Sequence, residues 1–224
     1  MLPDFSDIFD RYEALVAEVD TVFAKVAEQH PECVTCEKGC SDCCHALFDL
    51  SLVEAMYLNR SFKQSFGDGE ARSSIITRAN EADRKSYKIK RQAYRDSQAG
   101  IDTQTILENM ARERMRCPLL GTTDTCELYQ HRPITCRLYG IPTAIGGKAH
   151  TCGKAGFEKG KPYPTVHMDK IQDRLISLSQ EIADRVQSKF SELSGVFVPV
   201  SMALLTVYDE QYLGIRTPKK DADK

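Results

Sequence analysis

Hydrophobic and polar positions alternate with helical spacing along the first thirty residues. Apolar side chains recur at steps of three and four and would share one face of a helix. They are Phe5, Ile8, Tyr12, Leu15, Val19, Val22 and Val26. Pro3 suits a first turn, and Asp4 favours the positive end of the helix dipole. The pattern predicts a helix over 3–29 that packs on its own domain rather than in a coiled-coil dimer.

Four further stretches carry helical patterns. Ser51 and Glu54 form a capping box before a helix over 52–64. Residues 70–99 have a thin apolar face on a long polar helix, and Gly100 interrupts it. Asp102 or Thr103 can then cap a helix through Met115. These elements make up a helical insertion over 51–116, and the periodicity of 165–193 predicts a C-terminal helix.

The remaining segments are rich in loop-forming residues. Residues 30–50 are too irregular for a long element, and segment 117–162 contains four cysteines and four prolines. Only short strands or hairpins fit there. We therefore expect a mainly α fold, with helices packed around a small irregular cysteine-rich core and at most short strands. One domain over 1–217 and a mobile charged tail over 218–224 complete the expected organisation.

The composition is that of a globular protein. The 224 residues are 42% hydrophobic and 28% charged, and the net charge of −2 requires no polyanionic partner. No apolar run approaches the roughly 18–20 residues that a membrane span needs. The acidic first residues lack the basic and apolar regions of a signal peptide. These features predict a cytoplasmic protein without a membrane partner.

Nine cysteines then need an explanation. Cytosolic thiols are kept reduced, and an odd number fits a disulfide framework poorly, so the cysteines indicate a metal site. They fall in two blocks, over 33–45 and 117–155, separated by about seventy residues without a cysteine. The first block holds Cys33, Cys36, Cys40, Cys43 and Cys44, and the second holds Cys117, Cys126, Cys136 and Cys152. We expect the two blocks to converge on shared metal chemistry.

The spacing bears on the kind of metal. Two thiolates separated by two residues can bind one metal ion or one cluster from a tight turn. The adjacent Cys43 and Cys44 diverge, so either they serve two metals or one of them is not a ligand. Cysteines of the second block arrive singly, which favours an iron–sulfur cluster over zinc because each iron needs one thiolate. Cys36, Cys40 and Cys43 have radical-SAM spacing, but the chain lacks the alternating strands and helices of that barrel.

A family resemblance rests on three pieces of sequence. Gly39–Cys44 is followed by Cys117–Leu120 and by Cys126–Arg137, and together they resemble the CxxCxxCC (YkgJ-type) family of zinc- or iron-chelating cysteine-cluster proteins. Three residues, rather than two, separate Cys36 from Cys40, so whether Cys36, Cys33 or both are ligands stays open. The resemblance implies metal binding by Cys40, Cys43, Cys44, Cys117, Cys126, Cys136 and Cys152.

Other side chains near the cysteines are candidates for contacts with the cofactor. Arg132 and Arg137 flank Cys136 and would either donate hydrogen bonds to cluster sulfurs, bind an anionic substrate, or fix the loop. Tyr129 is expected to pack over the centre and exclude water. His45 follows the double cysteine and is the best histidine candidate for a ligand, although thiols are already sufficient.

Segment 84–95 carries six positive charges interleaved with Tyr87 and Tyr94. A nucleic-acid interface would have this composition. The alternative is a solvated helix face that complements the acidic first helix, since residues 1–32 hold eight carboxylates against two cations. We favour the second interpretation and do not expect nucleic acid as a partner.

Together these features predict a metalloprotein that binds one or two 4Fe–4S clusters, with an unidentified redox or protein partner. Electron transfer, redox sensing and cluster-dependent chemistry are the roles considered. Two alternatives stay open: a zinc-binding structural module or metal carrier, and an enzyme with an open iron site. Phosphate loops, nucleophile elbows and paired-histidine motifs are absent from the sequence, which disfavours an enzyme of those classes and assigns no catalytic residue.

Overall fold

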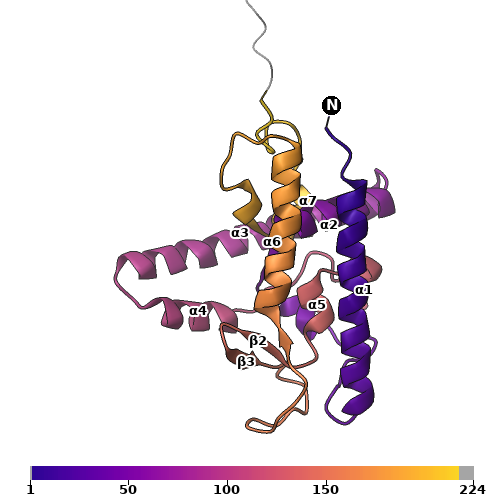
Figure 1. Ribbon diagram of the computed structural model, residues 1–224, viewed down its shortest axis with the longest axis vertical. Coiled ribbons are helices and arrows are strands. Elements are labelled where there is room, and N and C mark those ends of the chain that lie inside the picture. Colours follow the sequence, from indigo (N-terminus) through magenta and orange to yellow (C-terminus); the bar gives the residue numbers. More distant parts are fainter. Residues whose placement is uncertain (1, 217–224) are drawn as a thin grey trace, which may run out of the picture.

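The computed structural model describes residues 2–216, and the predicted tail over 218–224 lies outside the described residues. Within residues 2–216 the fold is mainly α, as predicted (Figure 1). None of these helices is long and apolar enough to cross a membrane. The α-helices are α1 (Ser6–Gln29), α2 (Leu52–Ser65), α3 (Glu70–Gln98), α4 (Thr103–Arg112), α5 (Ile134–Leu138), α6 (Met168–Arg185) and α7 (Val200–Leu205).

The strands are short, as the loop-rich segments predict. β1 (Asp49–Ser51) pairs antiparallel with β5 (Phe197–Pro199). β2 (Thr143–Ile145) forms a hairpin with β3 (Lys148–His150) and pairs in parallel with β4 (Val166–His167). The apolar stretch over 196–205, to which the sequence analysis assigned no element, supplies β5 and α7.

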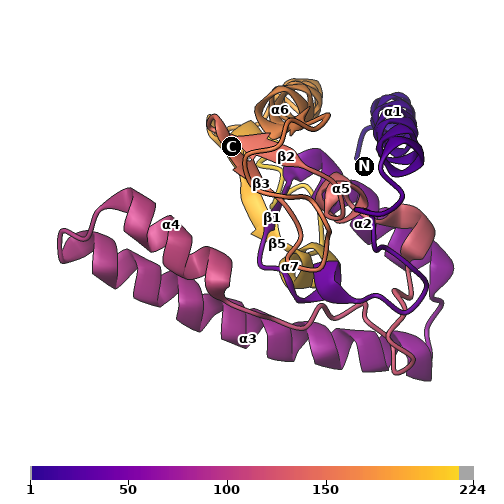
Figure 2. The ribbon, with the colours of Figure 1, turned by 90° about the horizontal axis from the view of Figure 1, so that it is seen from below.

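Helices α1 and α6 stand side by side and cover α2 and the short α5 (Figures 1 and 2). The predicted apolar face of α1 is buried except for Val22, which is 40% exposed. Ion pairs along the seam between the two helices join Asp7 to Arg185 and Glu18 to Arg174. Arginines of α6 therefore pair with two of the carboxylates of α1.

Two predicted helices end earlier than expected. The C-terminal helix stops at Arg185 rather than 193, because Gln187 adopts the left-handed conformation at φ 48°. Backbone N–H groups of Gln187 and Ser188 then cap the last turn in a Schellman arrangement, which normally uses glycine. Helix α4 stops at Arg112 rather than Met115, because the following residues extend and pair with the first cysteine block.

Helices α3 and α4 form an arm that extends from the body (Figures 1 and 2). The first half of α3 packs on α7, where Ile75, Ala79 and Ala82 are buried. After Ser86 no residue of α3 is buried, and α4 folds back along this outer half. The outer half of α3 is thus exposed to solvent and packs against α4.

Candidate metal centre

The first cysteine block lies on a loop that ends in a single 3₁₀ turn. Gly39 takes the left-handed conformation at φ 93°, and Cys40 N–H closes a turn onto Glu37 C=O over 3.0 Å. Cys43 and Cys44 follow on the 3₁₀ turn Asp42–His45. Neighbouring side chains on such a turn diverge by about 120°. The two side chains therefore leave the backbone in different directions, although their thiols stay close enough for Cys44 to donate to Cys43.

A short antiparallel pairing joins the two cysteine blocks. Met115 N–H donates to His45 C=O over 3.0 Å, and Cys117 N–H donates to Cys44 C=O over 2.7 Å. The second bond places Cys117 beside the double cysteine, although the two positions are far apart in sequence. This pairing is the structural basis for the predicted convergence of the blocks.

A tight turn and helix α5 bring in the next two cysteines. Glu127 N–H donates to Leu119 C=O over 2.8 Å, which folds Cys126 back toward Cys117. Cys136 lies in the middle of the five-residue α5. The first N–H of that helix, from Ile134, donates to the buried Glu54 carboxylate over 3.1 Å.

Glu54 connects three elements at this point. Besides Ile134 it accepts a hydrogen bond from the Ser51 hydroxyl over 3.1 Å, in the capping box that the sequence predicts. The Tyr12 hydroxyl of α1 lies 3.5 Å away. Burial raises the pKa of the Glu54 carboxyl, and the donors around it oppose that rise. One buried carboxyl group thus positions the helix that carries Cys136.

Cys152 reaches the site from the loop after the β2–β3 hairpin. Its thiol donates to the Asp42 carboxylate over 3.4 Å, and Asp42 pairs with Arg114 over 2.7 Å. The Asp42 side chain therefore joins the first block, the end of the arm and the last cysteine. No role was predicted for Asp42 from the sequence, because neither partner is near it in the chain.

The cysteines line two adjoining cavities. The inner cavity, of about 40 Å³, is lined mostly by apolar surface, which includes the side chains of Phe48, Leu119 and Leu128. The outer cavity is much larger, at about 770 Å³, and includes Asp20, Phe23 and Tyr139 in its wall. Five cysteines line the inner cavity: Cys43, Cys44, Cys117, Cys126 and Cys136. Seven line the outer cavity: Cys36, Cys40, Cys43, Cys44, Cys126, Cys136 and Cys152.

Eight of the nine predicted ligands thus gather in one place, and Cys33 does not. Cys33 lines neither cavity and donates to Glu32 over 3.3 Å. Its carbonyl accepts from Gly156 N–H over 2.8 Å, so this segment holds the Cys152 loop. His45 lines neither cavity, and its Nδ1 lies 3.0 Å from Ser41 C=O.

The thiols differ electrostatically. Burial raises the pKa of Cys117 to about 12 and that of Cys36 to about 11. For Cys43 a hydrogen bond from Cys44, assisted by the charge of Arg132, lowers the pKa to about 7. Cys43 therefore has a lowered pKa beside buried thiols, such as Cys117 and Cys136, whose pKa values are raised by burial.

Arg132 is the cation that faces both cavities. It lines each of them, its guanidinium lies 3.6 Å from the centre of the Tyr129 ring, and its Nε donates to Tyr129 C=O over 3.0 Å. The Tyr129 ring is 55% exposed at the rim of the outer cavity. Tyr129 and Arg132, which were separate candidates from the sequence, therefore contact each other and lie beside the thiols.

Arg137 has a different environment. Its side chain is buried and pairs with Asp20 of α1 over 2.6 Å. Nε donates to Arg132 C=O over 2.8 Å, and the remaining nitrogen bonds Gln130 C=O. All three nitrogens have protein partners, so Arg137 fixes the 130–132 loop even though it borders the outer cavity.

Gly140 is a residue that the sequence analysis missed. A Cβ at this position would lie 2.2 Å from Cys36 Sγ, so only glycine lets this thiol enter the outer cavity. The backbone of Gly140 needs no left-handed conformation. Close approach to a thiol from another loop is therefore the reason for glycine, and no local sequence signal reveals it.

Residues 35–153, more than half of the chain, match the family model CxxCxxCC, described as a "putative zinc- or iron-chelating domain". The chain belongs to this family. The matched region contains all eight cysteines that line the cavities and leaves out Cys33. Neither the curated proteins nor the solved structures yield a match.

The described residues fit the thiol chemistry of this family. Across positions 2–216 no three Cys, His, Asp or Glu side chains are placed to hold a single metal ion, and the thiols are instead spread around the two cavities. Thiolates are the preferred ligands of zinc and of iron–sulfur clusters. The CxxCxxCC domain of this chain thus combines sulfur donors, an apolar inner wall and a facing arginine.

Proposed function

We propose that this CxxCxxCC protein binds two 4Fe–4S clusters and serves in electron transfer or redox sensing. The observation that carries the proposal is the pair of adjoining cavities lined by eight thiols. A 4Fe–4S cluster takes four thiolates, one for each iron. Eight thiols around two cavities match two such sets.

The proposed division follows the cavity walls. Cys117 lines only the inner cavity, whereas Cys126 and Cys136 line both cavities. We assign these three cysteines to the inner group. Three cysteines line only the outer cavity and form the outer group: Cys36, Cys40 and Cys152. One thiol of the adjacent pair Cys43–Cys44 completes each group of four.

Bound clusters would supply one-electron chemistry at potentials set by hydrogen bonds and solvent exposure. The apolar wall formed by Phe48, Leu119 and Leu128 would limit the access of water to the inner group. Arg132 places positive charge next to both groups and favours the thiolate form of their cysteines. The outer cavity gives the outer group access to solvent or to a redox partner.

A second candidate is an enzyme with an open iron site. It is supported by the three cysteines that line only the outer cavity, because a cluster held by three thiolates keeps one iron free. The size of that cavity, about 770 Å³, would admit a substrate. A zinc-binding module is the third candidate. A purified protein of that kind would be colourless and contain no acid-labile sulfide, unlike a protein that holds iron–sulfur clusters.

Paired cysteine variants test the proposal. Cys126→Ser removes a ligand of the inner group and Cys152→Ser one of the outer group, while Cys33→Ser is the matched control outside both cavities. Iron, zinc and acid-labile sulfide would be measured per chain after anaerobic purification. We expect Cys126→Ser and Cys152→Ser each to lose about half of the iron and sulfide, and Cys33→Ser to lose none.

Other results would contradict specific parts of this assignment. Complete loss of iron in both cavity variants would show one shared cluster. Zinc without sulfide in the unaltered protein would exclude clusters. Full iron in Cys152→Ser, together with ligand-dependent spectral changes, would favour the open-site enzyme.

A further inference from the structure

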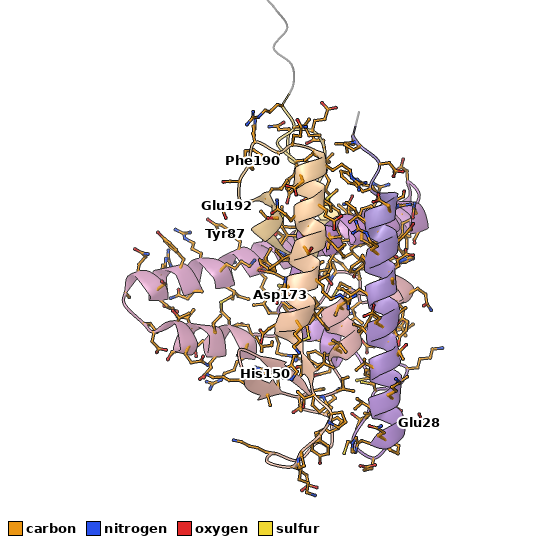
Figure 3. All side chains as sticks on the ribbon, in the orientation of Figure 1. Glu28, Tyr87, His150, Asp173, Phe190 and Glu192 are labelled. Carbon is orange, nitrogen blue, oxygen red and sulfur yellow. The ribbon has the colours of Figure 1, made fainter. Side chains whose placement is uncertain are left out.

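The outer half of α3 carries a stripe of cations and tyrosines, here called the arm stripe. It consists of Arg84, Tyr87, Lys88, Arg91, Tyr94 and Arg95, all exposed. The four cations are spaced by four, three and four residues and so share one helix face over about 16 Å. The two tyrosines follow the same edge seven residues apart and are 63% and 65% exposed. Figure 3 labels Tyr87 on this part of α3.

The charge of the arm differs from that of the whole protein. Residues 84–112 carry seven Lys and Arg against three Asp and Glu, in a chain whose net charge is −2. Two cations beside the stripe are engaged: Lys85 with Arg114 C=O over 2.8 Å, and Lys90 with Asp49 over 2.7 Å. Among residues 2–216, no carboxylate forms an ion pair with a cation of the stripe itself.

The interpretation of this face as a complement to the acidic first helix is wrong. Asp20 of α1 pairs with Arg137 of α5, while Glu18 and Asp7 pair with arginines of α6. None of the ion pairs that α1 forms within the described chain reaches α3. The positive charge of the stripe is therefore directed to solvent and is free to meet a partner.

The composition of the stripe favours one class of partner. Arg and Tyr also occur at protein–protein interfaces, but the centres of those interfaces are mainly apolar, whereas this face offers four cations and no aliphatic side chain. Rows of cations bind phosphate backbones, and exposed aromatic rings and guanidinium groups stack on unpaired bases. We propose that the arm stripe binds single-stranded nucleic acid. This binding is independent of the proposed clusters, since the stripe lies outside both cavities.

The test measures the salt dependence of binding. The metal-loaded protein would be titrated against a fluorescent single-stranded RNA and a DNA, each of about 20 nucleotides, at several salt concentrations. If the four cations neutralise four phosphates, the logarithm of the binding constant should fall with the logarithm of the salt concentration with a slope of about −3. The variant Arg84→Gln, Lys88→Gln, Arg91→Gln, Arg95→Gln should abolish that slope and weaken binding at least about 100-fold at low salt.

A charge-matched control separates the stripe from general attraction. Lys25→Gln, Lys148→Gln, Lys159→Gln and Lys170→Gln remove four exposed cations elsewhere and should keep the slope. Tyr87→Ala with Tyr94→Ala should weaken binding about 10-fold or more while the slope stays the same. Iron content and circular dichroism of each variant verify that the body and its metal are intact.

Three outcomes would overturn the proposal. One is an unaltered protein that binds no oligonucleotide at low salt. Another is equal loss in the stripe and control variants. The third, in a parallel titration with a duplex, is tight binding that the tyrosine changes do not affect, which would identify a groove-binding helix. None of these results bears on the cluster proposal, because iron and sulfide are counted separately.

Discussion

The inner and outer cysteine groups have the same ligand chemistry but different support. Cys117, Cys126 and Cys136 are held by backbone pairing and by α5, which is anchored on the buried Glu54. Cys36 and Cys40 lie on a loop that is held mainly by turns and by the fit of Gly140. The inner group is therefore part of the folded core, whereas the outer group is attached to it. Metal at the inner group should therefore be coupled to folding, and metal at the outer group should not.

The largest expected effect is the difference in stability between a variant that loses an inner-group ligand and one that loses an outer-group ligand. Cys136→Ser should lower the free energy of unfolding by at least about 3 kcal/mol and reduce metal content, because binding at the inner group is linked to folding. Cys40→Ser should lose metal but stay folded, with less than about 1 kcal/mol of destabilisation. Urea unfolding followed by circular dichroism measures both. Equal destabilisation by Cys136→Ser and Cys40→Ser would contradict the proposed difference in support between the two groups.

Removing the Glu54 anchor should have the next largest effect. Glu54→Ala leaves the buried N–H of Ile134 without its partner and breaks the capping box, at a cost of about 2–4 kcal/mol. Iron at the inner group should fall with the stability, and iron at the outer group should be retained in the folded fraction. Thermal unfolding with metal analysis of the folded protein measures both quantities. A variant as stable as the unaltered protein would contradict the anchoring role.

Glu54 also predicts a pH dependence. Burial raises the pKa of this carboxyl in the folded protein above the value of about 4.3 in an unfolded chain. The folded state therefore binds the proton more tightly, and stability falls as pH rises from about 4.3 through the folded pKa. Glu54→Gln cannot ionise, so its stability relative to the unaltered protein should increase with pH over that window. Urea titrations at several pH values measure this difference, and a constant difference would show that the pKa is not raised.

A smaller and local effect is expected at Gly140. Gly140→Ala places a Cβ 2.2 Å from Cys36 Sγ and should displace that thiol, with loss of outer-group metal and little change in overall stability. Gly153→Ala is the matched control, because nothing lies within 4 Å of a Cβ there and the glycine is next to Cys152. Iron and sulfide per chain distinguish the two variants. Equal metal content in both would show that Cys36 is not needed for the outer group.

The smallest effect is expected from Arg132→Lys. Lysine keeps the positive charge beside both groups but loses the planar contact with Tyr129. Metal content should stay the same if Arg132 acts by charge. Complete loss of metal would instead show that Arg132 holds the loop, and iron analysis decides between these roles.

Local signals made much of the fold predictable. Three helices were recognised from residues close together in the chain, and the structure contains each of them. The signals were the apolar stripe of α1, the capping box at Ser51 and the Asp102 cap of α4. The end of α6 was missed because a glutamine, not a glycine, takes the left-handed position. The exposure of Val22 was missed because heptad spacing does not show where the partner surface ends.

The site was predictable as a set of residue types but not as an arrangement. The two cysteine blocks do converge, and the separation of Cys33 agrees with the limits of the family match. The contacts that build the site join positions far apart in the chain, such as Glu54 with Ile134 and Gly140 with Cys36. Such pairs leave no periodic pattern. The roles of Glu54, Asp42 and Gly140 therefore required the structure.

We propose above all that the eight thiols hold two iron–sulfur clusters. Anaerobic purification followed by iron, zinc and acid-labile sulfide analysis per folded chain tests it most directly. Two 4Fe–4S clusters predict about eight iron atoms and about eight sulfides for each chain, with no stoichiometric zinc. Stoichiometric zinc without sulfide, or about four iron atoms and four sulfides, would contradict it.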